Sequence, residues 1–216
     1  MLVHDLTIVS TLALPFLLSM PIREDGAEQA GPWPVLCFLH GLGEGPPTEI
    51  YAAITAHGPL KPGSSPLATR EFILVAPQLP ARGDLWRSHA QAVCEIVSHV
   101  QSRYGGNHGR TYLTGFSFGG NGVFDVALHD ASLWAALWPV DPTRVPELDP
   151  SLPVWLSSGA ASRPLRSGFI KRLRLRPPEN GSDERVYLDE GLDHVGTAAS
   201  AYKSDLVYNW LLSKQI

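Results

Sequence analysis

The sequence is poor in cysteine, and this excludes folds held by several disulfides and zinc sites built from cysteines. Only two of its 216 residues are cysteines, Cys37 and Cys94, so the chain holds no disulfide framework and no cysteine spacing typical of a zinc site. Both lie in apolar segments, and we expect them to be buried thiols. No metal and no organic cofactor is implied by the sequence.

Charge and long apolar runs are also scarce. Charged residues make up 18% of the chain and the formal net charge is -4, which gives no reason to expect a nucleic acid or a membrane as partner. Residues 12–20 are mostly apolar, but they include Pro15 and are too few to span a bilayer. No Lys or Arg precedes them, so they lack the basic start of a signal peptide. We therefore expect a cytoplasmic protein with a small-molecule substrate. Its oligomeric state is left open.

Apolar runs alternate with helical patterns along the chain. Residues 34–39 and 72–76 are almost continuously apolar, as in strands of a parallel sheet that is covered on both faces. Residues 88–103 carry apolar side chains on one helical face. This alternation predicts an α/β fold with a mainly parallel, doubly wound sheet flanked by helices, with an antiparallel strand pair over residues 2–20 at one edge.

The length of the chain limits its organisation. It favours a single domain over residues 1–216. The predicted strands and helices use nearly all of these residues, so no insertion is long enough for a substantial lid.

A candidate nucleophile lies in residues 115–119, Gly-Phe-Ser-Phe-Gly, between a predicted strand at 110–114 and a predicted helix at 123–128. In this setting the G-x-S-x-G pattern predicts a nucleophile elbow, whose two glycines avoid clashes at a tight turn. The serine of such an elbow stands at a helix N-terminus, where backbone N–H groups stabilise an anion. We therefore predict that Ser117 is the nucleophile.

A serine hydroxyl needs a base, and histidine titrates in the right range. Of the eight histidines, only His129 and His194 follow Ser117, as the order nucleophile, acid, histidine requires. His129 falls in the helix after the elbow and points away from the nucleophile. His194 falls in the loop after the last predicted strand, at the sheet edge where parallel strands gather ligands, and is the predicted base.

The turn at residues 40–44, His-Gly-Leu-Gly-Glu, follows a buried strand at the same edge. We predict that the N–H groups of Leu42 and Phe118 form an oxyanion hole. Gly41 and Gly43 are expected to allow close backbone approach to the substrate pocket. His40 and Glu44 are expected to hold the turn by hydrogen bonds without reacting.

Trp86 follows the strand at 72–76 and is a candidate wall of the substrate pocket. A surface-anchoring tryptophan is the alternative.

These motifs together resemble the α/β-hydrolase superfamily. Within it the chain is similar to the phospholipase/carboxylesterase-like group labelled "predicted peptidase", related to feruloyl esterases and dienelactone hydrolases. The resemblance extends from about Leu14 onward and implies the α/β-hydrolase fold. It also implies serine carboxylesterase activity on short or soluble acyl esters, through an acyl-enzyme. The segments that carry it are residues 40–44, 57–59, 76–78, 112–120, 193–194 and 208–212.

One position departs from the family pattern. Members of the group usually place the triad acid just after the strand that here covers residues 152–157, and Ser162 stands where that aspartate should be. Asp141 ends the preceding predicted strand at the same sheet edge, and we predict it as the substitute acid. Asp141-Pro142 also fits a helix N-cap. The remaining local carboxylates share the loop of the predicted base and are less able to reach its far ring nitrogen: Asp189, Glu190 and Asp193.

Two other functional classes stay open. A peptidase or thioesterase would use the same residues. A degenerate hydrolase fold that only binds a ligand is the second alternative, because Ser162 replaces the usual acid.

Overall fold

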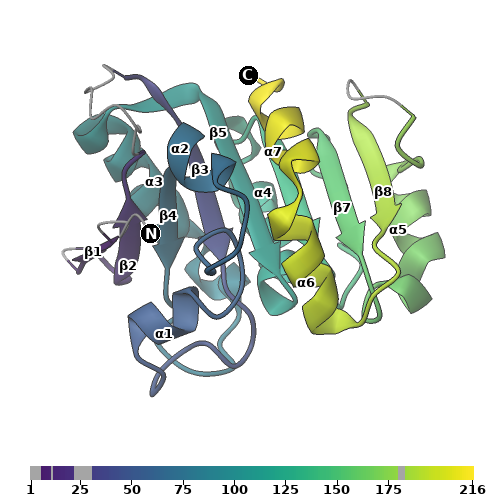
Figure 1. The fold of residues 1–216 in the computed structure, drawn as a ribbon, viewed down its shortest axis with the longest axis horizontal. Coiled ribbons are helices and arrows are strands. Elements are labelled where there is room, and N and C mark those ends of the chain that lie inside the picture. The colour runs from purple at the N-terminus through teal and green to yellow at the C-terminus, as the bar shows by residue number, and fades with distance from the viewer. Residues whose placement is uncertain (1–5, 11, 22–30, 180–182) are drawn as a thin grey trace.

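The computed structural model describes residues 6–10, 12–21, 31–179 and 183–216. Within them the strands form one 8-stranded sheet in the order β1-β2-β4-β3-β5-β6-β7-β8 (Figure 1). The pairs β1–β2 and β2–β4 are antiparallel and the other neighbouring pairs are parallel. The mainly parallel sheet with an antiparallel edge is therefore confirmed. The strands are β1 Leu6–Val9, β2 Phe16–Ser19, β3 Trp33–Leu39, β4 Ile73–Pro77, β5 Gly106–Phe116, β6 Ala136–Val140, β7 Val154–Ser158 and β8 Arg185–Asp189.

Helices cover both faces of this sheet. In Figure 1, α1 (Ile50–Ile54), α2 (Leu67–Glu71), α6 (His194–Lys203) and α7 (Asp205–Leu212) lie in front of it, and α3 (Ala90–Tyr104), α4 (Phe118–His129) and α5 (Arg166–Leu173) lie behind it. Each layer encloses its own apolar cluster, because side chains along a strand alternate between the two faces. In the described residues these elements follow one another without a separate lid.

Local sequence explains several elements directly. β3 and β4 are buried along nearly their whole length, as expected for strands covered on both faces. The buried side chains of α3 fall on one face, and the helix ends at Gly105, whose φ of 71° is a left-handed conformation that glycine tolerates. Cys37 and Cys94 are buried and free, as predicted.

Two helices differ from the sequence-based expectation. α2 lies in a segment rich in Gly, Pro and Ser that predicts a loop. α6 begins at His194, where a loop was expected, because the Asp193 side chain caps it by accepting the Gly196 N–H at 2.7 Å. Conversely, residues 142–153 form no helix, so Asp141 is not a helix cap and that alternative is wrong.

No helix in the described ranges combines the length and the apolar character needed to cross a membrane.

Candidate active site

Ser117 occupies the turn that joins β5 to α4. Its backbone has φ 58° and ψ -116°, a conformation that a residue other than glycine rarely adopts. A Cβ at Gly115 would collide with the carbonyl of Gly119, and one at Gly119 would collide with the carbonyl of Leu39. The strand-turn-helix geometry of the predicted elbow is therefore present, with Ser117 9% exposed at its apex.

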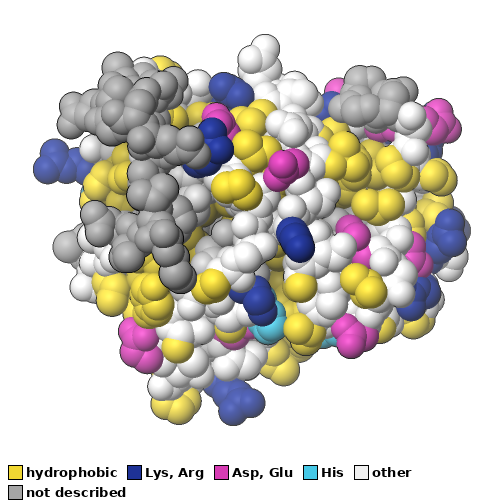
Figure 2. All heavy atoms as spheres, viewed as in Figure 1, with side chains coloured by type: hydrophobic (Ala, Val, Ile, Leu, Met, Phe, Trp, Pro, Cys, Tyr) yellow, Lys and Arg dark blue, Asp and Glu magenta, His cyan; other side chains and the backbone are white. Residues whose placement is uncertain are grey.

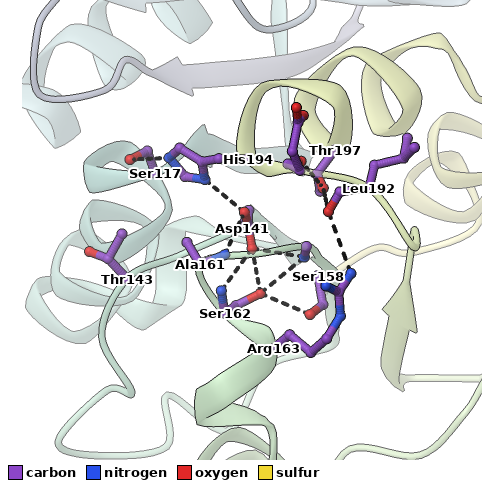
Figure 3. A network of polar contacts seen from close by, with 12 residues as sticks. Ser117, Asp141, Thr143, Ser158, Ala161, Ser162, Arg163, Leu192, His194 and Thr197 are labelled. Carbon is purple, nitrogen blue, oxygen red and sulfur yellow. Dashed lines mark hydrogen bonds and ion pairs between the residues drawn. The ribbon is translucent and has the colours of Figure 1, made fainter.

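A continuous chain of hydrogen bonds links Ser117, His194 and Asp141 (Figure 3). His194 Nε2 lies 2.9 Å from Ser117 Oγ, and His194 Nδ1 lies 2.7 Å from Asp141 Oδ2. An ionised carboxylate only accepts, so Nδ1 carries the proton and Nε2 is free to accept the serine hydroxyl. Ser117 and Asp141 directly follow β5 and β6, and His194 starts α6 after β8, so all three lie at the carboxyl edge of the sheet.

The Asp141 carboxylate is fully buried and accepts several hydrogen bonds besides that of His194. Its Oδ1 accepts the N–H groups of Gly159 at 2.8 Å and Ser162 at 2.9 Å, and its Oδ2 accepts that of Ala161 at 3.2 Å. Burial alone would raise the pKa of Asp141, but hydrogen bonds from His194 and Ser162 outweigh it and the pKa is lowered. Asp141 is therefore an ionised brace for the histidine.

Ser162 has a part in this network that its sequence position does not reveal. Its hydroxyl donates to Asp141 Oδ1 at 2.6 Å (Figure 3). The residue that stands where the related group has its acid thus hydrogen-bonds the acid supplied by β6.

The turn after β3 lies against the nucleophile, and its polar groups are held internally. His40 is 1% exposed; its Nε2 accepts the Leu79 N–H at 3.0 Å and its Nδ1 donates to the Gly41 carbonyl at 2.8 Å. Burial lowers the pKa of His40 to about 4, against a smaller opposite effect of the Gly41 hydrogen bond, so the ring is neutral. The supporting geometry expected of His40 is present.

Glu44 fixes the same turn from its other end. Its Oε2 accepts the Gly41 N–H at 2.7 Å, as expected of a support. Burial raises the pKa of Glu44, while the Gly41 hydrogen bond and the Lys61 charge lower it by less. The Leu42 N–H has no hydrogen-bond partner among the described residues. The Phe118 N–H is the first of α4 and lacks an intrahelical partner as well.

The comparisons with solved structures agree with this architecture. A thermostable esterase superposes with a TM-score of 0.73 at 20% identity; the match covers 98% of this chain, which spans only 64% of the length of that esterase. Two Staphylococcus aureus proteins, the fluorophosphonate-binding serine hydrolase FphF and the S-formylglutathione hydrolase FrmB, each match with a TM-score of 0.66 and 13% identity, over 96% of this chain and 97% of theirs. The chain has the α/β-hydrolase fold. No family model and no curated protein sequence matches it.

In this α/β-hydrolase fold the two glycines of the turn differ. A Cβ at Gly41 would lie 3.6 Å from the Ser117 Cβ, so the backbone does approach the nucleophile closely there. A Cβ at Gly43 would meet no atom within 4 Å, so this side of Gly43 is open and its part in the substrate pocket stays a prediction.

Trp86 is buried beneath the turn. It is 2% exposed, and its Nε1 donates to the His40 carbonyl at 3.0 Å, so the surface-anchoring alternative is wrong. Trp86 also forms part of the wall of a cavity that adjoins Phe118. The structure thus gives it both a supporting contact and a place near a possible pocket.

Sequence reasoning gave no role at the site to Phe116 or His57. The Phe116 ring lies between two histidines, with its centroid 4.6 Å from that of His194 and 5.0 Å from that of His57. His57 Nε2 in turn lies 3.6 Å from Glu44 Oε1. Phe116 is part of the G-x-S-x-G pattern and was visible as such, but nothing local indicates that its ring would contact the base.

The site reaches solvent on the face shown in Figure 2, where histidine side chains surface between α1 and α6 beside a basic side chain. Within the described residues no group of three or more His, Cys, Asp and Glu is placed to hold a metal ion.

Proposed function

We propose that this protein is a serine hydrolase that cleaves carboxylic esters. The observation that carries the proposal is the unbroken hydrogen-bonded chain from Asp141 through His194 to Ser117. Nucleophile, base and orienting acid are recognised by such geometry and not by their positions in the sequence. The matched structures, an esterase and two hydrolases, support the same reaction class.

In the proposed reaction Ser117 Oγ attacks the ester carbonyl while His194 Nε2 takes its proton. The negative oxygen that develops is held by the N–H groups of Leu42 and Phe118, each worth about 3 kcal/mol in measured oxyanion holes. His194 then gives the proton to the leaving alcohol, and water hydrolyses the acyl-enzyme by the same steps. Asp141 stays ionised throughout and stabilises the charged imidazole.

Short or soluble acyl esters are the proposed substrates, because no lid covers the site in the described residues. A thioester is the second candidate, since one matched structure is named an S-formylglutathione hydrolase. Assays of oxyester, thioester and amide substrates at equal concentration separate these activities. The cytoplasmic location and the single domain stay predictions.

A fluorophosphonate probe tests the proposal directly. We expect it to label Ser117, and we expect Ser117→Ala to abolish labelling and lower turnover roughly 10⁶-fold, the loss measured for a triad nucleophile elsewhere. Ser88→Ala removes an exposed hydroxyl outside the site and is the matched control. A folded protein whose Ser117 is not labelled would contradict the enzyme assignment and favour a binding protein.

A further inference from the structure

A cavity of about 310 Å³ lies beside the first turn of α4, outside the hydrogen-bonded chain of the triad. This volume is at the lower end of the range found for small-molecule sites. Phe118, which follows the nucleophile directly in the chain, contributes to its wall. The residues of its lining that matter for binding are Arg87, Phe118, Asn121, Asp125, Thr143 and Arg144.

One wall of the cavity is fixed relative to the nucleophile by Asn121. The Asn121 backbone N–H donates to the Ser117 carbonyl at 3.1 Å. Its side-chain amide donates to Thr143 Oγ1 at 2.8 Å, and its side-chain oxygen accepts the N–H groups of Thr143 and Arg144 at 3.0 Å each. Figure 3 shows Thr143 near the start of the helix that Ser117 precedes. The wall is therefore built and not a loose loop.

The charged side chains around the cavity leave an excess of positive charge. Arg144 Nη2 contacts both carboxylate oxygens of Asp125 at 2.7 Å, which offsets one charge but engages only one of the guanidinium nitrogens. Arg87 is exposed and forms no ion pair with any residue that the structure describes. Two guanidinium groups of the lining thus have donors available for an anion, and the lining holds one carboxylate.

The position of His194 shows which part of an ester would enter. The leaving oxygen has to lie next to His194 Nε2, which returns the proton to it. His194 starts α6, whereas the cavity is lined by the segment after β4, by α4 and by the segment after β6. None of these segments carries His194, so the acyl group, which extends away from His194, is the part of an ester that this cavity can receive.

We propose that this cavity receives the acyl chain of the substrate and that Arg87 and Arg144 pair with a carboxylate on it. The substrate class would then be monoesters of dicarboxylic acids. This inference rests on the proposed ester hydrolase activity.

The test compares two para-nitrophenyl esters with acyl chains of equal length, the monoester of adipic acid and the ester of hexanoic acid. We expect wild-type kcat/KM to favour the adipate monoester by about tenfold, and Arg87→Glu to remove this preference, because a charge reversal replaces attraction by repulsion. Added salt should weaken the preference, since the arginine is exposed to solvent.

Two further variants test the direction of the charge effect and provide a matched control. Asp125→Asn removes the one carboxylate of the lining and should strengthen the adipate preference a few-fold. Arg82→Glu makes the same charge change at an exposed arginine of the same connecting segment that does not line the cavity, and should leave the preference as it is.

The outcomes distinguish this inference from the activity on which it rests. If the wild-type enzyme hydrolyses the hexanoate ester but shows no adipate preference, or if Arg87→Glu and Arg82→Glu alter the preference equally, the carboxylate subsite is wrong and the esterase proposal stands. If neither ester is hydrolysed and Ser117 is not labelled by the fluorophosphonate, both proposals fall.

Discussion

His40 follows β3 and His194 follows β8, and both lie at the carboxyl edge of the same sheet, close to Ser117. The His40 ring is buried and both of its nitrogens bond to the backbone, so the ring stays neutral and fixed. The His194 side chain is 35% exposed, with a buried carboxylate on one nitrogen and the serine hydroxyl on the other. The same residue type is thus held as a fixed support at one strand end and lies partly exposed between a carboxylate and a hydroxyl at the other.

The hydrogen-bond networks at the ends of β3 and β6 also differ in what they hold in place. At the end of β3 the polar groups bond to one another and to the turn that they hold. At the end of β6 the Asp141 carboxylate accepts hydrogen bonds from the segment after β7 and from the His194 ring. One region holds a turn in place, and the other holds a charge in place.

The largest effect that tests this contrast is expected from Asp141→Asn. The amide cannot brace His194 as an ionised carboxylate does, and we expect kcat to fall by 10³ to 10⁴-fold, about 4–5 kcal/mol in activation free energy. Turnover and thermal unfolding are measured together, with Asp189→Asn as a control at an exposed carboxylate paired with Arg163. Turnover near the wild-type value would remove Asp141 from the proposed triad.

A smaller effect is expected from His40→Gln, and it concerns how the free energy of unfolding depends on pH. The pKa of His40 is about 4 in the folded protein and its ordinary value is 6.5, so between these pH values the unfolded chain binds a proton that the folded protein does not. The wild-type free energy of unfolding should therefore decrease as the pH falls from 6.5 to 4, by roughly 3 kcal/mol in total.

Denaturant unfolding at several pH values between 7 and 4 checks this slope. His40→Gln should flatten it, whereas His129→Gln, a change at an exposed helix residue, should not. An equal slope in wild type and His40→Gln would show that another group causes the acid sensitivity.

Ser162→Ala is expected to lower the free energy of unfolding by about 1–2 kcal/mol, because it removes a hydrogen bond to a charged acceptor. The remaining donors keep Asp141 in place, so kcat should fall by only about tenfold. The pKa of Asp141 should rise, because a donor to the ionised form is lost. The stability that its lowered pKa provides is lost as the pH falls through that pKa, and this loss should begin at a higher pH in the variant. Unchanged kcat and unchanged acid unfolding would deny Ser162 any part in holding the acid.

The smallest effect is expected from Asp193→Ala, which removes the N-cap of α6 and should cost about 1 kcal/mol of stability. Because His194 keeps its contacts with Asp141 and Ser117, kcat should change by less than about threefold. A loss of kcat comparable to that of Asp141→Asn would place Asp193 in the catalytic arrangement.

Much of the fold follows from local patterns in the sequence. The apolar runs of β3 and β4, the one-sided apolar face of α3 and the elbow at Ser117 were all predicted, and the α/β-hydrolase fold is confirmed. These patterns are informative because burial on both faces, burial on one face and a steric limit at a turn each constrain the residues that experience them.

Helix α6 could not be predicted in the same way. Val195, Gly196 and Thr197 are weak helix formers at its start. The helix forms because Asp193 caps it and because Ala198 and Tyr202 are buried against the sheet. The sequence shows the cap but not the surface against which the helix packs.

By itself the sequence predicted a nucleophile, a histidine and a supporting turn, because each is tied to its own strand end by a local pattern. The sequence also predicted Asp141 as the acid, but only the tertiary structure decided how its carboxylate is held and how it reaches His194. Asp141 lies 53 positions before His194 and 21 positions before Ser162 in the sequence, and the register of β6, β7 and β8 brings these residues together. Such contacts depend on the packing of whole strands, and no local pattern around Ser162 shows that its hydroxyl holds the aspartate of a neighbouring strand.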